Sequence, residues 1–222
     1  MKKFVCCAQP LGSDGCEEHD YHLFLPPTDP YVRLYWQYHR TTTASPFFHN
    51  PQARKVIALD CEMGTSLNLE SELIRLTAID FFTRQTLVDK LVQPTVPMKH
   101  YNTRYSGVTP EAMRNAVKSG NCYRGRDEAR NRLLELIGPE TIVVMHGGNN
   151  DLTALRLIHP LVIDTHLLEC YNPKTEGGRS LKVVCKKHLG MNIQAGKNGH
   201  DSLEDAEACR ELLHFWIKSI PD

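Results

Sequence analysis

The segment at residues 56–64, with the sequence VIALDCEMG, constrains the fold more than any other stretch of the chain. Its first four residues are apolar, as in a buried strand, and two carboxylates follow at Asp60 and Glu62. Side chains two residues apart in a strand project from the same face of the sheet. The segment therefore predicts a core strand that ends with two acids on one face and Cys61 on the other.

Strands and helices alternate along the chain after residue 51. We expect strands in the apolar runs bounded by turn residues, at residues 55–63, 72–82, 86–94, 141–147 and 161–165. We expect helices at residues 109–117, 126–138, 151–158, 180–190 and from about 202 onward. This order predicts an α/β domain at residues 51–222, with a mixed five-stranded sheet flanked by helices. Residues 1–50 are expected to form a separate N-terminal segment and linker.

The last expected helix has an apolar stripe that indicates which of its faces meets the core. The stripe consists of residues at spacings of three and four, namely Ala206, Cys209, Leu213, Trp216 and Ile220. Ser202 is suited to the N-cap position, and Asp205 lies beside the start of the stripe. We therefore expect Asp205 at the edge of the core, facing the sheet.

The composition is that of an ordinary soluble globular protein and argues against several classes of function. The chain has 26 basic and 26 acidic residues, so general electrostatic binding of nucleic acid is disfavoured, although a local basic groove is allowed. No apolar run approaches the roughly 18 residues of a membrane span, and the N-terminus lacks the apolar stretch of a signal peptide. The eight cysteines then indicate reduced thiols or a metal site. We expect an intracellular protein, in the nucleus rather than the cytoplasm.

Asp60 and Glu62 taken alone are a weak signal, because both side chains can simply be solvated at the end of a strand. Two later segments strengthen it. Asp151 follows an expected strand and a glycine-rich turn, at the edge where open α/β sheets bind their ligands. Asp205 lies in the first turn of the last helix, and His200 lies just before that helix.

Together these residues predict a metal site for hydrolysis at phosphorus. Four carboxylates, Asp60, Glu62, Asp151 and Asp205, can hold two divalent cations about 4 Å apart. Hard carboxylate oxygens suit Mg²⁺ or Mn²⁺. An imidazole beside them can accept a proton from the attacking water, and His200 is placed for this role.

The same motifs resemble those of the DEDDh 3′–5′ exonucleases. ALDCEMG at residues 58–64 is similar to the first motif of that family, Asp151 takes the place of the second, and HDSLED at residues 200–205 gives the His-x4-Asp of the third. NTRYSGVT at 102–109, IDT at 163–165 and SLKVVCKKHLG at 180–190 are similar to segments of the eukaryotic Rex-type RNA exonucleases. The chain departs from this pattern at Gly148, where relatives usually carry an apolar residue.

The resemblance implies an RNase H-like fold and a 3′–5′ exoribonuclease that releases 5′-mononucleotides in RNA processing or decay. Its partner would be the 3′ end of single-stranded RNA, with single-stranded DNA as an alternative, and no membrane. The resemblance also implies that Met63 and Glu62 approach the terminal nucleotide. A 3′–5′ DNA exonuclease stays open, because the catalytic residues do not distinguish RNA from DNA. A catalytically silent RNA-binding scaffold also stays open, although retention of all five reactive residues argues against it.

The N-terminal segment carries side chains of the kind that bind zinc. A tetrahedral site can be built from Cys7 (or the adjacent Cys6), Cys16, His19 and His22. The spacing of these residues is not that of a standard zinc finger. The hypothesis is therefore a Zn²⁺ site, and the alternative is a loose segment with reduced thiols.

Overall fold

The computed structural model describes residues 53–171, 179–196 and 199–220, together with residues 8–10, 13–14, 28, 30, 32 and 36–41. Contacts between Cα atoms divide the chain into two units, Met1–Gln37 and Tyr38–Asp222. The hypothetical zinc ligands Cys7, Cys16, His19 and His22 lie outside the described residues, and the predicted boundary after residue 50 stays a prediction. None of the helices in the described part is long and apolar enough to cross a membrane.

A mixed sheet of seven strands forms the centre of this unit, with the order β6-β4-β3-β2-β7-β9 and with β5 paired to β2. The strands are β2 (Val56–Ser66), β3 (Ser71–Asp80), β4 (Thr86–Gln93), β5 (Met98–His100), β6 (Cys122–Arg124), β7 (Ile142–Met145) and β9 (Val162–Asp164). β2, β3 and β4 are antiparallel neighbours, whereas β7 runs parallel to β2, and β9 runs parallel to β7. A separate parallel pair is formed by β1 (His39–Arg40) and β8 (Leu157–Ile158).

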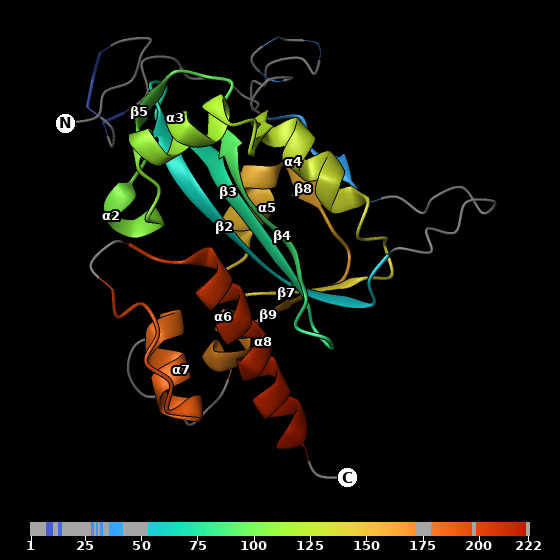
Figure 1. Cartoon of the computed structure of the whole chain (residues 1–222). Coiled ribbons are helices and arrows are strands. Elements are labelled where there is room, and N and C mark those ends of the chain that lie inside the picture. Colours follow the sequence, from blue (N-terminus) through green and yellow to red (C-terminus); the bar gives the residue numbers. More distant parts are fainter. Residues whose placement is uncertain are drawn as a thin grey trace. The chain divides into compact units, whose positions relative to one another are not determined.

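Seven helices surround the sheet in the described part of this unit (Figure 1). They are α2 (Thr103–Ser106), α3 (Pro110–Lys118), α4 (Gly125–Leu134), α5 (Asn149–Leu155), α6 (Thr165–Cys170), α7 (Leu181–Leu189) and α8 (Ser202–Lys218). α8 runs beside α7 and contacts β2, β3 and β7. The α/β class with helices around a mixed sheet is therefore confirmed.

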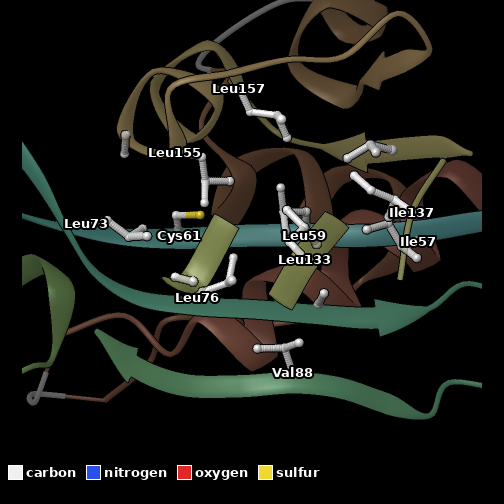
Figure 2. Packing of buried hydrophobic residues seen from close by; sticks show 14 of the residues in the cluster. Ile57, Leu59, Cys61, Leu73, Leu76, Val88, Leu133, Ile137, Leu155 and Leu157 are labelled. Atoms are coloured by element: carbon white, nitrogen blue, oxygen red, sulfur yellow. The ribbon is translucent and has the colours of Figure 1, made fainter. Parts of the chain in front are cut away.

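The two faces of β2 bury different sets of side chains. Ile57, Leu59 and Cys61 belong to a core cluster with residues of α4 and α5, and Figure 2 shows them beside Leu133 and Leu155. The even-numbered positions face the opposite way, and Ala58 belongs to a second cluster with residues of α7 and α8. This alternation follows from the period of two in a strand. It gives Asp60 and Glu62 the face that α8 covers.

Several details of the structure differ from the predictions. The sheet contains β5 and β6 in addition to the five predicted strands, because three-residue strands are too short to show an alternating pattern. Leu157–Ile158 was expected in a helix but forms β8, since Arg156 takes a left-handed conformation that ends α5. Ile220 lies beyond the end of α8 and is 69% exposed, so it does not extend the apolar stripe.

The N-cap of α8 is Asp201 rather than the predicted Ser202. The Asp201 carboxylate accepts a hydrogen bond from the backbone N–H of Leu203. The Ser202 hydroxyl lies 2.6 Å from the hydroxyl of Thr77 on β3, and both side chains are fully buried. Ser202 therefore joins the start of α8 to the sheet, which leaves the capping position to its neighbour.

Candidate active site

The strand β2 places Asp60 and Glu62 just beyond the end of a neighbouring strand. β7 pairs with β2 only from Val56 to Ala58, and it ends at Met145. β2 was expected to end near residue 63 but continues to Ser66, with a bulge after Glu62. The two acids thus lie at the carboxyl end of a parallel pair, where open sheets place their ligand sites.

Asp205 on α8 completes a group of three carboxylates. Asp60, Glu62 and Asp205 each have an oxygen within 4.8 Å of an oxygen of the other two, and we call this group the acid cluster. Glu62 is 7% exposed and Asp205 is 3% exposed, while Asp60 is partly exposed. The expectation that Asp205 faces the sheet at the edge of the core is confirmed.

Asp151 reaches the same strand from the first turn of α5. One of its oxygens, Oδ1, accepts a hydrogen bond of 2.7 Å from the backbone N–H of Cys61, the residue between the two acids of β2. The turn before α5 is held by Asp164, whose carboxylate accepts the N–H groups of Gly147 and Gly148. A Cβ atom at Gly148 would lie 1.6 Å from the sulfur of Met145, so the side chain of Met145 occupies the space that a side chain at position 148 would need.

The carboxylates lie close together in a largely buried site, where they repel one another. Desolvation, followed by repulsion from Asp151, Asp205 and Glu62, raises the pKa of Asp60 well above its usual value. Desolvation likewise raises the pKa of Glu62 to about 8, of Asp151 to about 7 and of Asp205 to about 6. A buried group of like charges favours protonation unless cations lie between the acids.

His200 lies beside the acid cluster on a loop held by backbone contacts. Its Nδ1 is 3.7 Å from Oδ2 of Asp205, and its side chain is 41% exposed. The backbone N–H of His200 donates to the carbonyl oxygen of Tyr105 at 2.6 Å. Gly199 has φ +89°, and a Cβ atom there would lie 2.3 Å from the backbone nitrogen of Gly107. The close approach of Gly199 to Gly107 therefore fixes the position of His200.

Arg75 was not predicted from the sequence as a site residue, yet it is the cation that acts on both Asp60 and Glu62. Arg75 lies opposite Glu62 in the β2–β3 register and lowers the pKa of that carboxyl, against the desolvation that raises it. Its guanidinium contacts Asp89 on β4 at 2.9 Å and Asp201 at 3.0 Å. Arg75 thus connects the sheet to the His200 loop. Its signal in the sequence is that it is the single cation of β3, with apolar residues on either side.

Met63 has a defined partner near the site. Its carbonyl oxygen accepts a hydrogen bond of 3.1 Å from the side-chain amide of Asn102, which also lies 3.3 Å from the Thr65 hydroxyl. Asn102 has φ 52°, a left-handed conformation that asparagine tolerates better than most residues. The segment before α2 is therefore joined to β2 beside the acid cluster. The contact of Met63 with a nucleotide stays a prediction.

A comparison with protein families covers the same part of the chain. A family model described as Exonuclease (RNase_T) matches residues 57–213, a range that includes all five predicted catalytic residues. The chain belongs to this exonuclease family. The part of the chain that matches the family includes the acid cluster, Asp151 and His200.

Curated relatives of this exonuclease domain carry the names of RNA exonucleases. The chain is 36% identical to RNA exonuclease 3 of Emericella nidulans, over 95% of this chain and 36% of that protein. It is 32% identical to RNA exonuclease 3 of Candida albicans, over 97% of this chain and 51% of that protein. It is 38% identical to RNA exonuclease 1 of Saccharomyces cerevisiae, over 73% of this chain and 28% of that protein. The chain thus spans about half or less of the length of these relatives.

Solved structures confirm the exonuclease fold. The Pan2 catalytic unit of Neurospora crassa, with protease and nuclease domains, has a TM-score of 0.63 and 22% identity, over 83% of this chain and 30% of that one. The Saccharomyces cerevisiae Pan2 module in complex with AAGGAA RNA has a TM-score of 0.63 and 24% identity, over 83% of this chain and 32% of that one. At 22–24% sequence identity, the structural similarity to these two proteins shows a shared fold.

Proposed function

We propose that the protein is a metal-dependent 3′–5′ exoribonuclease that removes 5′-mononucleotides from the 3′ end of single-stranded RNA. The observation that carries this proposal is the acid cluster, in which three carboxylates from β2 and α8 converge within 4.8 Å. Membership of the exonuclease family and the names of the RNA exonuclease relatives support the same reaction.

The side chains present fit a site for hard divalent cations. The donors are carboxylate oxygens, which Mg²⁺ and Mn²⁺ prefer. Burial and then mutual repulsion raise the pKa values of Asp60 and Glu62, and bound cations would offset both effects. Asp60, Glu62 and Asp205 would hold one ion, and Asp151, joined to β2 through Cys61, would share in a second. When bound, such ions stabilise negative charge on the attacking and leaving oxygens at phosphorus.

The remaining residues would position the substrate and move the proton. His200 is exposed enough to meet water and lies beside Asp205, so it would accept the proton of the attacking water. The segment from Asn102 to Tyr105 would border the terminal nucleotide, because Asn102 contacts Met63 and Tyr105 contacts His200.

The test is a degradation assay with four substrates labelled at the 5′ end or internally. They are a linear RNA with a free 3′ hydroxyl, the same RNA with a 3′ phosphate, a circular RNA, and single-stranded DNA of the same sequence. In Mg²⁺ the linear RNA should shorten stepwise from its 3′ end and release 5′-mononucleotides. The 3′-phosphorylated RNA should be degraded slowly or not at all, and chelation of the metal should stop every reaction.

Each alternative has its own outcome in this assay. Cleavage of circular RNA at the rate of linear RNA would identify an endonuclease. Faster degradation of DNA than of RNA would favour the DNA exonuclease. RNA binding without degradation in either Mg²⁺ or Mn²⁺ would favour the silent scaffold. The Zn²⁺ site and the nuclear location are separate hypotheses.

A further inference from the structure

Gln194 contacts the acid cluster from outside the predicted catalytic set. Its side-chain nitrogen Nε2 lies 3.1 Å from Oδ1 and 3.0 Å from Oδ2 of Asp205, so the amide donates to the carboxylate. Gln194 is half-buried and precedes α8 by eight residues in the chain, in the segment between α7 and α8. Nothing in the predicted chemistry of the site requires an amide at this point.

The backbone of Gln194 is fixed by partners on both neighbouring helices. Its N–H donates to Oε2 of Glu204 on α8 at 2.8 Å, and its carbonyl oxygen accepts from the ammonium of Lys182 on α7 at 2.9 Å. The preceding residue, Ile193, is 2% exposed and belongs to the core cluster of α7 and α8. Gln194 has φ 53°, an unusual conformation for a residue other than glycine. The loop therefore holds this amide at a defined place.

A fixed amide donor has a specific effect on a metal-binding carboxylate. It favours the ionised form, because a carboxylate accepts hydrogen bonds and a neutral amide adds no charge. It also restrains the rotation of the carboxylate about its last bond. An oxygen of a carboxylate has more than one lone pair, so the amide leaves acceptor capacity for a cation. Partners of this kind orient metal ligands and raise metal affinity.

We infer that Gln194 is a positioning residue that orients Asp205 for a divalent cation. The inference rests on the proposed function, since it assigns a role to Gln194 in the same metal site. The rival interpretation is that the amide merely fills the place of the cation and has to leave when the metal binds. The two interpretations predict opposite changes in metal affinity when the amide is removed.

The experiment measures Mn²⁺ binding to the full chain by isothermal titration calorimetry, together with the melting temperature in EDTA. Gln194→Met keeps the length of the side chain and removes the donor. Gln194→Ala only removes atoms and provides a second reading in case Met disturbs the fold. Gln85→Met is the matched control. Gln85 is exposed in the turn between β3, which ends at Asp80, and β4, which begins at Thr86.

Both Gln194 variants should bind Mn²⁺ more weakly by about 10–100-fold, with a melting temperature in EDTA close to that of the wild type. RNA cleavage by these variants should recover towards the wild-type rate at high Mn²⁺, and Gln85→Met should behave like the wild type throughout. Unchanged or tighter Mn²⁺ binding in the Gln194 variants would overturn the inference while leaving the proposed function intact. Absence of Mn²⁺ binding by the wild type would instead overturn the proposed function, and this inference with it.

Discussion

The acid cluster and the buried carboxylate of Glu169 both lie near α8, and their surroundings differ sharply. Glu169 on α6 is 1% exposed and contacts the ammonium of Lys187 at 2.9 Å and Nε2 of His188 at 2.9 Å. The acid cluster is also largely buried, but its carboxylates face one another and Asp151. Both sites bury an acid, but the direct contact with an ammonium group is at Glu169.

This difference separates a structural site from a functional one. The partners of Glu169 come from α7, so the contact joins two helices and holds the fold together. The acid cluster receives a partial offset from Arg75, which is itself shared with Asp89 and Asp201. Repulsion between close acids persists only where the surrounding fold enforces it, and such sites are candidates for binding cations.

The largest effect should come from removing a charge from the acid cluster. Asp205→Asn should lower the rate of RNA cleavage by about 10⁴-fold or more, because loss of metal binding removes several kcal/mol of transition-state stabilisation. Glu169→Gln should leave the rate per folded molecule near that of the wild type. Single-turnover cleavage in saturating Mg²⁺ measures both. Comparable losses in the two variants would remove the distinction between the sites.

A pair of histidines sharpens the contrast, because each carboxylate site has one. His200→Ala should lower the single-turnover rate by about 10²–10⁴-fold, the usual contribution of a general base, while Mn²⁺ affinity and melting temperature stay near wild type. His188 is largely buried against Phe215 and Trp216, so His188→Ala should lower the melting temperature and spare the rate. A loss of metal affinity in His200→Ala as severe as in Asp205→Asn would make His200 a ligand.

Removing the charge of Glu169 should lower the stability of the fold. Glu169→Gln leaves Lys187 and His188 without their anionic partner, and breaking a buried ion pair is strongly destabilising. Because Lys187 is 37% exposed, solvent screens part of the loss, and we expect a decrease in the free energy of unfolding of about 2–3 kcal/mol. Urea unfolding in EDTA measures this value. A stability equal to that of the wild type would show that the compensated site is dispensable for the fold.

The acid cluster should also give a pH dependence without metal. Because the pKa of Glu62 is raised to about 8 in the folded state, folded protein binds this proton more tightly than unfolded protein does. The contribution of Glu62 to stability is therefore present at low pH and is lost as pH rises towards 8. Glu62→Gln cannot ionise, so its stability relative to the wild type should increase between pH 5 and pH 8, by on the order of 1–2 kcal/mol. A constant difference in stability across this pH range would mean that the pKa of Glu62 is not raised in the folded state.

Local periodicity explains what the sequence could predict here. The shared face of Asp60 and Glu62 follows from the period of a strand, and the inward position of Asp205 follows from the stripe on α8. Contacts that depend on loop conformation gave no such signal. Gln194 reaches Asp205 only because its backbone is left-handed and anchored to two helices. Arg75 meets Asp201 only after the sheet and α8 have come together.

The same limit applies to the short elements and to the cap of α8. β5 and β6 contain three residues each, too few to show a period, and their pairing is decided by the neighbouring strands. Ser202 and Asp201 are equally good caps by residue type. The buried contact between Ser202 and Thr77 decides between them, and Thr77 lies far away in the sequence.

Melting temperatures test directly whether the acid cluster is a cation site. They are measured for the wild type and for Asp60→Asn, each in EDTA and in Mn²⁺. If the acid cluster is a cation site held together against its own repulsion, Mn²⁺ should raise the melting temperature of the wild type. Asp60→Asn should melt at the same or a higher temperature than the wild type in EDTA, and Mn²⁺ should stabilise it much less. A wild type that does not respond to Mn²⁺, or a clear drop in the melting temperature of Asp60→Asn in EDTA, would contradict the account, since the acids would then be structural.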